Sequence, residues 1–205
     1  MNRSFPLSLA IVLLLVVPSY SQSGRVRQQT ASSTARVADT PSQSQPVQRE
    51  DDHPPLSLVL NETEFENADG TTAKLTDYKG KIVLVNLWAI WCGPCREEMP
   101  QLQSLFDTYH AQGLEVLGLN AGDHSGELET IPKIQSFAHQ RNITYSVGRA
   151  PRPFMRAMYA LSKQYAIPQT ILIDRDNHLR AIYVGGGRII YDQLQEQVKK
   201  LLAEP

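Results

Sequence analysis

Hydrophobic residues along the chain fall into blocks whose spacing separates strands from helices. Residues 81–89 form a nearly continuous apolar run with several β-branched side chains, as expected for a central strand covered on both faces, and residues 114–120 predict a second buried strand. Between them, residues 93–112 place apolar side chains at helical spacing, and Gly113 is suited to end that helix. The same criteria predict two helices, two strands and a last helix farther along: 129–141, 154–165, 170–174, 179–184 and 191–202.

The segment before the first strand indicates a β-hairpin. Residues 56–60 alternate weakly, and an Asp-Gly turn at Asp69 and Gly70 precedes residues 71–75. The full order is hairpin, strand, helix, strand, helix, helix, strand, strand, helix. This order predicts an α/β fold in which a parallel βαβ unit and an antiparallel ββα unit form one central mixed sheet, flanked by helices on both faces.

The N-terminal part of the chain differs in composition from the rest and divides into two segments. Residues 1–21 open with a basic residue, an apolar run at 7–17 and small residues, and the run is about half of the length that crosses a bilayer. This pattern indicates a secretory signal peptide cleaved before Gln22, with an uncleaved N-terminal anchor as the alternative. Residues 22–55 contain no Leu, Ile or aromatic residue and predict a disordered linker, which leaves 56–205 as one domain.

Charge is nearly balanced along the chain. There are 20 Lys and Arg residues against 21 Asp and Glu, which argues against nucleic acid or an anionic membrane surface as a partner. Either form of the N-terminal segment places the domain outside the cytoplasm, in an oxidising compartment, with membrane contact only through an uncleaved anchor. The two cysteines, Cys92 and Cys95, are too few and too close for a fold held together by several disulfides.

These cysteines stand where the first predicted strand ends and the long helix begins. A thiolate at a helix N-terminus faces unpaired backbone N–H groups and the positive end of the helix dipole, and both stabilise it. The spacer Gly93-Pro94 lets one helical turn bring the sulfurs together as a reversible disulfide. We therefore expect Cys92, on the solvent side, to attack a substrate disulfide and Cys95, deeper in the helix, to resolve the mixed disulfide.

Other interpretations of the pair compete with exchange chemistry. A structural zinc site requires two more ligands, and none of the five histidines is paired with another at ligand spacing, so we expect no metal. An inert structural disulfide stays open, although a bridge between such close residues hardly constrains the unfolded chain. A peroxiredoxin is disfavoured because the sequence has no Pro-x3-Thr-x2-Cys motif and no distant resolving cysteine.

Residues 86–100, NLWAIWCGPCREEMP, resemble the active-site segment of the thioredoxin superfamily, and more narrowly of the TlpA/ResA/CcmG group of extracytoplasmic thiol-disulfide oxidoreductases. Further matches are DYKGK at 77–81, before the strand, and IPQTILID at 167–174. The resemblance covers about residues 56–202. It implies a thioredoxin-like fold with an N-terminal hairpin and an inserted helix and connection within residues 129–153.

The resemblance also implies which residues contact the substrate. The proline corresponding to Pro168 is cis in this family and lies against the two cysteines, and the backbone of Ile167 would pair with the substrate chain. From the sequence alone, Pro168 could equally be a trans proline that starts a strand. Trp91 would provide a platform on the substrate face, and Gly93 and Pro94 complete the predicted contacts.

Two departures from thioredoxin remove its buried proton relay. Asn86 stands where thioredoxin has a buried Asp, and Gly118 stands where its Lys partner lies. Glu98, one helical turn after Cys95, matches a Glu of the ResA group that is associated with cysteine acidity, and it would accept the thiol proton during resolution. An ordinary solvated charge is the alternative interpretation of Glu98.

The residues and the resemblance together predict an extracytoplasmic thiol-disulfide oxidoreductase that reduces protein disulfides, with cytochrome c maturation as a candidate pathway. Its partners would be protein thiols and disulfides, apocytochrome c among them, and a membrane electron donor, with no cofactor beyond the redox-active Cys92–Cys95 disulfide. The Gly-Pro spacer resembles that of reducing thioredoxins, but one dipeptide does not set the reduction potential, so a net oxidant or isomerase stays open. A thioredoxin-fold binding module without turnover is the alternative from a different class.

Overall fold

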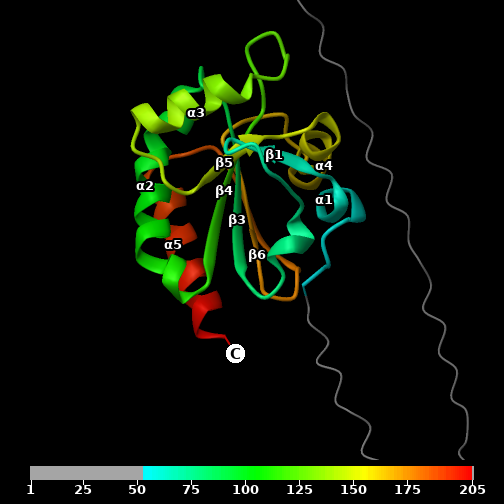
Figure 1. The fold of residues 1–205 in the computed structure, drawn as a ribbon. Coiled ribbons are helices and arrows are strands. Elements are labelled where there is room, and N and C mark those ends of the chain that lie inside the picture. The colour runs from blue at the N-terminus through cyan, green and yellow to red at the C-terminus, as the bar shows by residue number, and fades with distance from the viewer. Residues whose placement is uncertain (1–52, 205) are drawn as a thin grey trace, which may run out of the picture. The chain divides into compact units, whose positions relative to one another are not determined.

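Residues 53–204 are described by a computed structural model, shown in Figure 1. The predicted signal peptide or anchor, and residues 22–52 of the predicted linker, lie outside the described residues. A mixed sheet runs through the domain, and helices pack on both of its faces (Figure 1). The α/β fold class expected from the order of the elements is confirmed.

The sheet formed by the described residues has seven strands in the spatial order β2-β1-β5-β4-β3-β6-β7. Strand β3 is parallel to β4 and β4 is parallel to β5, whereas the pairs toward both edges are antiparallel. The strands are β1 (Phe65–Asn67), β2 (Thr72–Ala73), β3 (Ile82–Trp88), β4 (Leu114–Asn120), β5 (Ser146–Arg149), β6 (Gln169–Ile173) and β7 (Leu179–Val184).

Two hydrophobic cores lie on the two faces of the sheet. Helices α2, α3 and α5 contribute to one, here called the α2-side core, and helices α1 and α4 contribute to the other, the α4-side core (Figure 1). Within residues 53–204, no helix is both long and apolar enough to cross a bilayer. The helices are α1 (Leu58–Glu62), α2 (Gly93–Tyr109), α3 (Ile131–Gln140), α4 (Arg152–Ser162) and α5 (Arg188–Ala203), with short 3-10 turns at Leu75–Tyr78 and His110–Gln112.

Strand β3 runs through the middle of the sheet and is buried along its whole length, as predicted. Its side chains alternate, so that Leu84 and Trp88 enter the α2-side core and Val85 and Leu87 enter the α4-side core. Asn86 is fully buried and lies between Leu84 and Trp88 in this alternation. The strand therefore presents an amide side chain to the helix that carries both cysteines.

The start of the domain differs from the predicted hairpin. Residues 56–60, expected as its first strand, lead into helix α1, because the Ser57 side chain caps the helix by accepting a hydrogen bond from the Leu60 N–H at 3.3 Å. The hairpin forms instead between β1 and β2. Before α1, the Pro54 carbonyl oxygen accepts a hydrogen bond from the Leu179 N–H at 3.1 Å, so the chain already follows β7 within the segment assigned to the linker.

Residues 129–153 contain a strand in addition to the expected helix. Helix α3 crosses from β4 to β5, and β5 lies between β4 and β1 as a third parallel strand. The sequence missed β5 because it has only four residues, among them Gly148, and no apolar alternation. A side chain at Gly148 would collide with the Glu66 carbonyl group, so this glycine permits β1 to pair alongside.

Candidate active site

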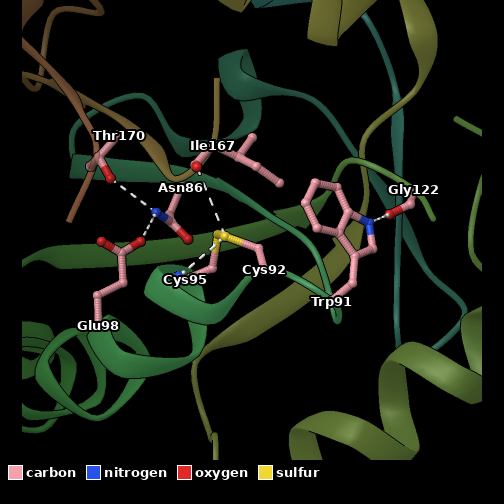
Figure 2. Close-up of a disulfide and its surroundings, with 8 residues drawn as sticks. All are labelled: Asn86, Trp91, Cys92, Cys95, Glu98, Gly122, Ile167 and Thr170. Atoms are coloured by element: carbon pink, nitrogen blue, oxygen red, sulfur yellow. Dashed lines mark hydrogen bonds between the residues drawn. A yellow bond between two sulfur atoms is a disulfide. The ribbon is translucent and has the colours of Figure 1, made fainter. Parts of the chain in front are cut away.

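The two cysteines form a disulfide at the start of α2 (Figure 2), with an S–S length of 2.09 Å. Cys92 is the N-cap residue, and its Sγ accepts a hydrogen bond from the Cys95 N–H at 3.2 Å. Cys92 is 4% exposed and Cys95 is fully buried. The outer sulfur, Cys92, is thus the one within reach of a substrate, and the Cys95 N–H is placed to stabilise its thiolate after reduction.

A cis peptide bond joins Ile167 to Pro168, as the resemblance implied. The Ile167 carbonyl oxygen lies 3.8 Å from Cys92 Sγ, which places this backbone segment beside the outer sulfur (Figure 2). Residues 167 and 168 come just before β6, the strand that pairs with β3 in the sheet. An extended chain bound along this segment would therefore bring its own sulfur next to Cys92.

A glycine loop reaches the same place from the end of β7. The Gly185 N–H donates a hydrogen bond to the Pro168 carbonyl oxygen at 2.8 Å. A methyl group on Gly186 would lie 3.5 Å from Pro168 Cγ and 3.6 Å from the Pro94 carbonyl oxygen. Gly93 and Pro94, the spacer between the cysteines, form the first turn of α2. The spacer, the cis-proline and the glycine loop therefore meet around the disulfide although they come from distant parts of the chain.

Trp91 borders the disulfide and is held by the loop that follows β4. Its side chain is 40% exposed, consistent with a position on the protein surface. Its Nε1–H donates a hydrogen bond to the Gly122 carbonyl oxygen at 3.1 Å (Figure 2). The exposed His124 ring stacks on it, with ring centroids 4.5 Å apart and an interplanar angle of 26°. Sequence reasoning missed Gly122 and His124, because nothing in their spacing links them to Trp91.

Glu98 is buried and is not the solvated charge considered as an alternative. Its Oε1 accepts a hydrogen bond from Asn86 Nδ2 at 2.6 Å (Figure 2). Burial raises the pKa of the Glu98 carboxyl to about 7, and the hydrogen bond from Asn86 acts in the opposite direction. A carboxyl that titrates near neutral pH one helical turn from Cys95 is suited to take up or release a proton there.

Asn86 connects the helix to the neighbouring strand. Besides Glu98, its Nδ2 donates a hydrogen bond to Thr170 Oγ1 on β6, at 3.0 Å. In Figure 2 these two hydrogen bonds link the side chains of Glu98, Asn86 and Thr170, which lie beside the disulfide. Sequence reasoning singled out Asn86 as a departure from thioredoxin but did not predict either of its partners.

Gly118 does not leave an empty site where thioredoxin has a lysine. A Cβ on Gly118 would lie 3.0 Å from Tyr145 Cε2 and 3.3 Å from Trp88 Nε1, so these two rings fill the space. The Tyr145 hydroxyl is buried, and burial, followed by the negative charge of Glu98, raises its pKa. The lysine is therefore replaced by aromatic packing.

Comparison with known proteins places the chain in a family. A family model described as AhpC/TSA matches residues 57–182, more than half of the chain. The chain belongs to the AhpC/TSA family. The match extends from α1 into β7 and so includes both cysteines, Asn86 and Pro168.

Known proteins similar to this AhpC/TSA-family chain are named for thiol-disulfide chemistry. The thiol-disulfide oxidoreductase ResA of Geobacillus thermodenitrificans is 32% identical over 123 residues, which cover 59% of this chain and slightly less than two thirds, 64%, of that protein. A secreted thiol-disulfide isomerase of Corynebacterium glutamicum has a TM-score of 0.59 at 25% identity, over 71% of this chain and 86% of that one. A thioredoxin-family thiol:disulfide interchange protein of Chlorobium tepidum has a TM-score of 0.61 at 24% identity, over 74% of this chain and 99% of that one. These similarities confirm the thioredoxin-like fold.

Proposed function

We propose that this protein is a thiol-disulfide oxidoreductase that acts outside the cytoplasm and reduces disulfides in proteins. The observation that carries the proposal is a Cys92–Cys95 disulfide at the N-terminus of α2 with its outer sulfur 3.8 Å from the Ile167 carbonyl oxygen, next to cis-Pro168. The names of the similar proteins support the same chemistry.

In the first step, the Cys92 thiolate attacks one sulfur of the substrate disulfide. The substrate S–S bond breaks, a new S–S bond joins Cys92 to the substrate, and the departing substrate sulfur takes up a proton. Cys95 then loses its proton and attacks Cys92 Sγ, which releases the second substrate thiol and re-forms the Cys92–Cys95 disulfide. Two electrons pass to the substrate, and an external dithiol must return them to the protein.

The surroundings of Cys92 support a polypeptide substrate. The Ile167 carbonyl oxygen lies 3.8 Å from Cys92 Sγ and precedes a cis-proline, which supports pairing of the Ile167 backbone with an extended substrate chain. Trp91 adds an exposed aromatic surface whose orientation is held by Gly122 and His124. We therefore propose that the site recognises the main chain and the shape of the substrate rather than its charge.

Reduction is the favoured direction because the Gly-Pro spacer resembles that of reducing thioredoxins. Apocytochrome c is the candidate substrate and a dithiol protein of the membrane the candidate electron donor, both from the resemblance to the TlpA/ResA/CcmG group. The apolar segment at residues 1–21 supports an extracytoplasmic location. A net oxidant or isomerase would use the same residues with a higher reduction potential.

The decisive experiment compares wild type with Cys92→Ser and Cys95→Ser in reduction of a protein disulfide by a dithiol. Cys92→Ser should be inactive, whereas Cys95→Ser should complete the first attack and accumulate a mixed disulfide that mass spectrometry detects. Equal activity of Cys92→Ser and wild type would overturn the enzymatic proposal and favour a binding module. The reduction potential of the pair, measured against glutathione, then distinguishes a reductant from an oxidant.

A further inference from the structure

The buried amide of Asn86 has one atom that is not satisfied. Its Nδ2 donates two hydrogen bonds, to Glu98 Oε1 at 2.6 Å and to Thr170 Oγ1 at 3.0 Å. Its Oδ1 is buried and has no hydrogen-bond partner among the described residues. In Figure 2 this oxygen points toward the side on which Cys95 and the disulfide lie. A buried acceptor without a donor costs free energy of folding. Because this oxygen faces the reacting sulfurs, we ask whether it acts on Cys95 during the reaction.

The charge of Glu98 dictates which way the amide faces. An ionised carboxylate only accepts hydrogen bonds, so it selects the orientation in which Nδ2 faces it and Oδ1 faces Cys95. A protonated carboxyl has a donor O–H, and the Thr170 hydroxyl can donate as well as accept. With Glu98 protonated, an amide turned by 180° would therefore keep both partners, with Oδ1 accepting from each, and would direct its N–H group at Cys95.

We propose that Asn86 is a positioning residue whose amide turns in step with the proton on Glu98: during resolution it offers the Cys95 thiol an acceptor while Glu98 is ionised, and it offers the Cys95 thiolate a donor once Glu98 has taken up the proton. The inference rests on the exchange chemistry proposed above. The proton lost when the Cys95 S–H bond breaks is taken up by Glu98, directly or through water, and the amide itself gains and loses none. The pair of Cys95 and Glu98 carries one negative charge in both arrangements.

Few other titratable groups face Glu98 in the part of the chain that the structure describes. Tyr191 of α5 lines a small cavity with it, and Tyr145 is near enough for the negative charge of Glu98 to raise the pKa of its hydroxyl. Burial and the bond from Asn86 are the two influences on the Glu98 pKa, which burial raises to about 7. Both amide orientations are therefore accessible within the neutral pH range.

The first test is nuclear magnetic resonance of the reduced wild-type protein between pH 5 and 9. The side-chain amide protons of Asn86 should show contacts to the Cys95 β-protons at low pH and lose them at high pH, with the same midpoint as the Glu98 carboxyl carbon. Amide protons that keep the same neighbours across the whole range would overturn the proposal. This measurement needs no variant and stands if a variant fails to fold.

The second test separates the two cysteines by rate. Reduced protein reacts with an aromatic disulfide reagent, 5,5′-dithiobis(2-nitrobenzoate), in two phases: release of the first thiolate reports attack by Cys92, and release of the second reports resolution by Cys95. Asn86→Leu should slow the second phase about tenfold at pH 7, the effect of losing one hydrogen bond to a charged group, and leave the first within twofold. Glu98→Gln should remove the step near neutral pH from the second phase.

Gln169→Leu is the matched control, because Gln169 is also a fully buried amide but hydrogen-bonds to the Met158 carbonyl oxygen of α4. It should leave the pH profile of the second phase unchanged. A second phase with the same pH profile in wild type and Asn86→Leu would overturn the role of Asn86 and leave the proposed function intact. Absence of a fast first phase in wild type would instead contradict the proposed function.

Discussion

Asn86 and Glu98 form a buried hydrogen bond of 2.6 Å between β3 and α2. Burial nevertheless dominates and raises the pKa of the Glu98 carboxyl from 4.5 to about 7. In the unfolded chain the same carboxyl titrates near its ordinary value. The folded protein therefore keeps a proton on Glu98 over a pH range in which the unfolded chain has lost it.

The free energy of unfolding should consequently fall as the pH rises from about 4.5 to about 7. In this window the folded state binds more protons than the unfolded state. The stability that Glu98 contributes by its raised pKa is therefore fully present below the window and lost above it. The gap between the two pKa values corresponds to roughly 3 kcal/mol. Urea unfolding of the oxidised protein at pH 4.5, 6 and 8 measures the change.

Glu98→Gln is the control for this prediction, because glutamine keeps the length and the acceptor oxygen without the titrating proton. Between about pH 4.5 and about pH 7, wild type should lose roughly 3 kcal/mol of unfolding free energy relative to Glu98→Gln. Parallel pH profiles for the two proteins would show that Glu98 does not titrate between these values.

Tyr145→Phe should stabilise the protein. The Tyr145 hydroxyl is buried and without a hydrogen-bond partner among the described residues, whereas its ring packs in the α2-side core. A buried hydroxyl left unpaired costs roughly 1–3 kcal/mol, and phenylalanine removes it while keeping the ring. Urea unfolding should show a gain of about 1 kcal/mol. A loss of stability would mean that an internal water satisfies the hydroxyl.

Gly118→Ala should destabilise the protein by overpacking. The added Cβ would lie 3.0 Å from Tyr145 Cε2 and 3.3 Å from Trp88 Nε1, so both rings, which pack in the α2-side core, would have to shift by a few tenths of an ångström. We expect the unfolding free energy to fall by roughly 1–3 kcal/mol. In a Tyr145→Leu background the same substitution should cost less, because the obstructing ring is gone. Additive costs in the double variant would contradict the contact.

Gly122→Ala should weaken substrate binding through Trp91. Gly122 has a φ of 104°, and a Cβ added to it would lie 2.5 Å from the Glu127 carbonyl oxygen. Alanine must therefore shift the backbone of residue 122, whose own carbonyl oxygen accepts the hydrogen bond from Trp91 Nε1. We expect KM for a protein disulfide to rise about fivefold, the effect of one lost hydrogen bond, with kcat within twofold. Steady-state kinetics and tryptophan fluorescence measure these changes.

Gly126→Ala is the matched control in the same loop. Gly126 also has a positive φ, of 81°, but nothing lies within 4 Å of its Cβ position. Its backbone strain should therefore resemble that of Gly122→Ala without the collision. An equal rise of KM in both variants would attribute the effect to loop strain and not to the orientation of Trp91.

The success of the sequence predictions followed the strength of the local pattern. Strand β4 was predicted at its observed bounds, because its residues are mostly apolar and Gly113, which ends the preceding helix, marks where the strand begins. Residues 56–60 were predicted wrongly, because five weakly alternating residues suit a strand as well as a helix until the Ser57 cap is known. Strand β5 was missed because pairing with β4 and β1, and not its own composition, stabilises it.

By itself, the sequence determined where the two cysteines lie, at the junction of β3 and α2, because a spacing of one helical turn is a local feature of neighbouring residues. Only the tertiary structure decided what surrounds them. Asn86 and Thr170 are 84 residues apart in the chain, and Trp91 and Gly122 are 31 apart. Whether Glu98 is solvated or buried likewise depends on how α2 packs against the sheet, and a short sequence motif contains no information about such packing.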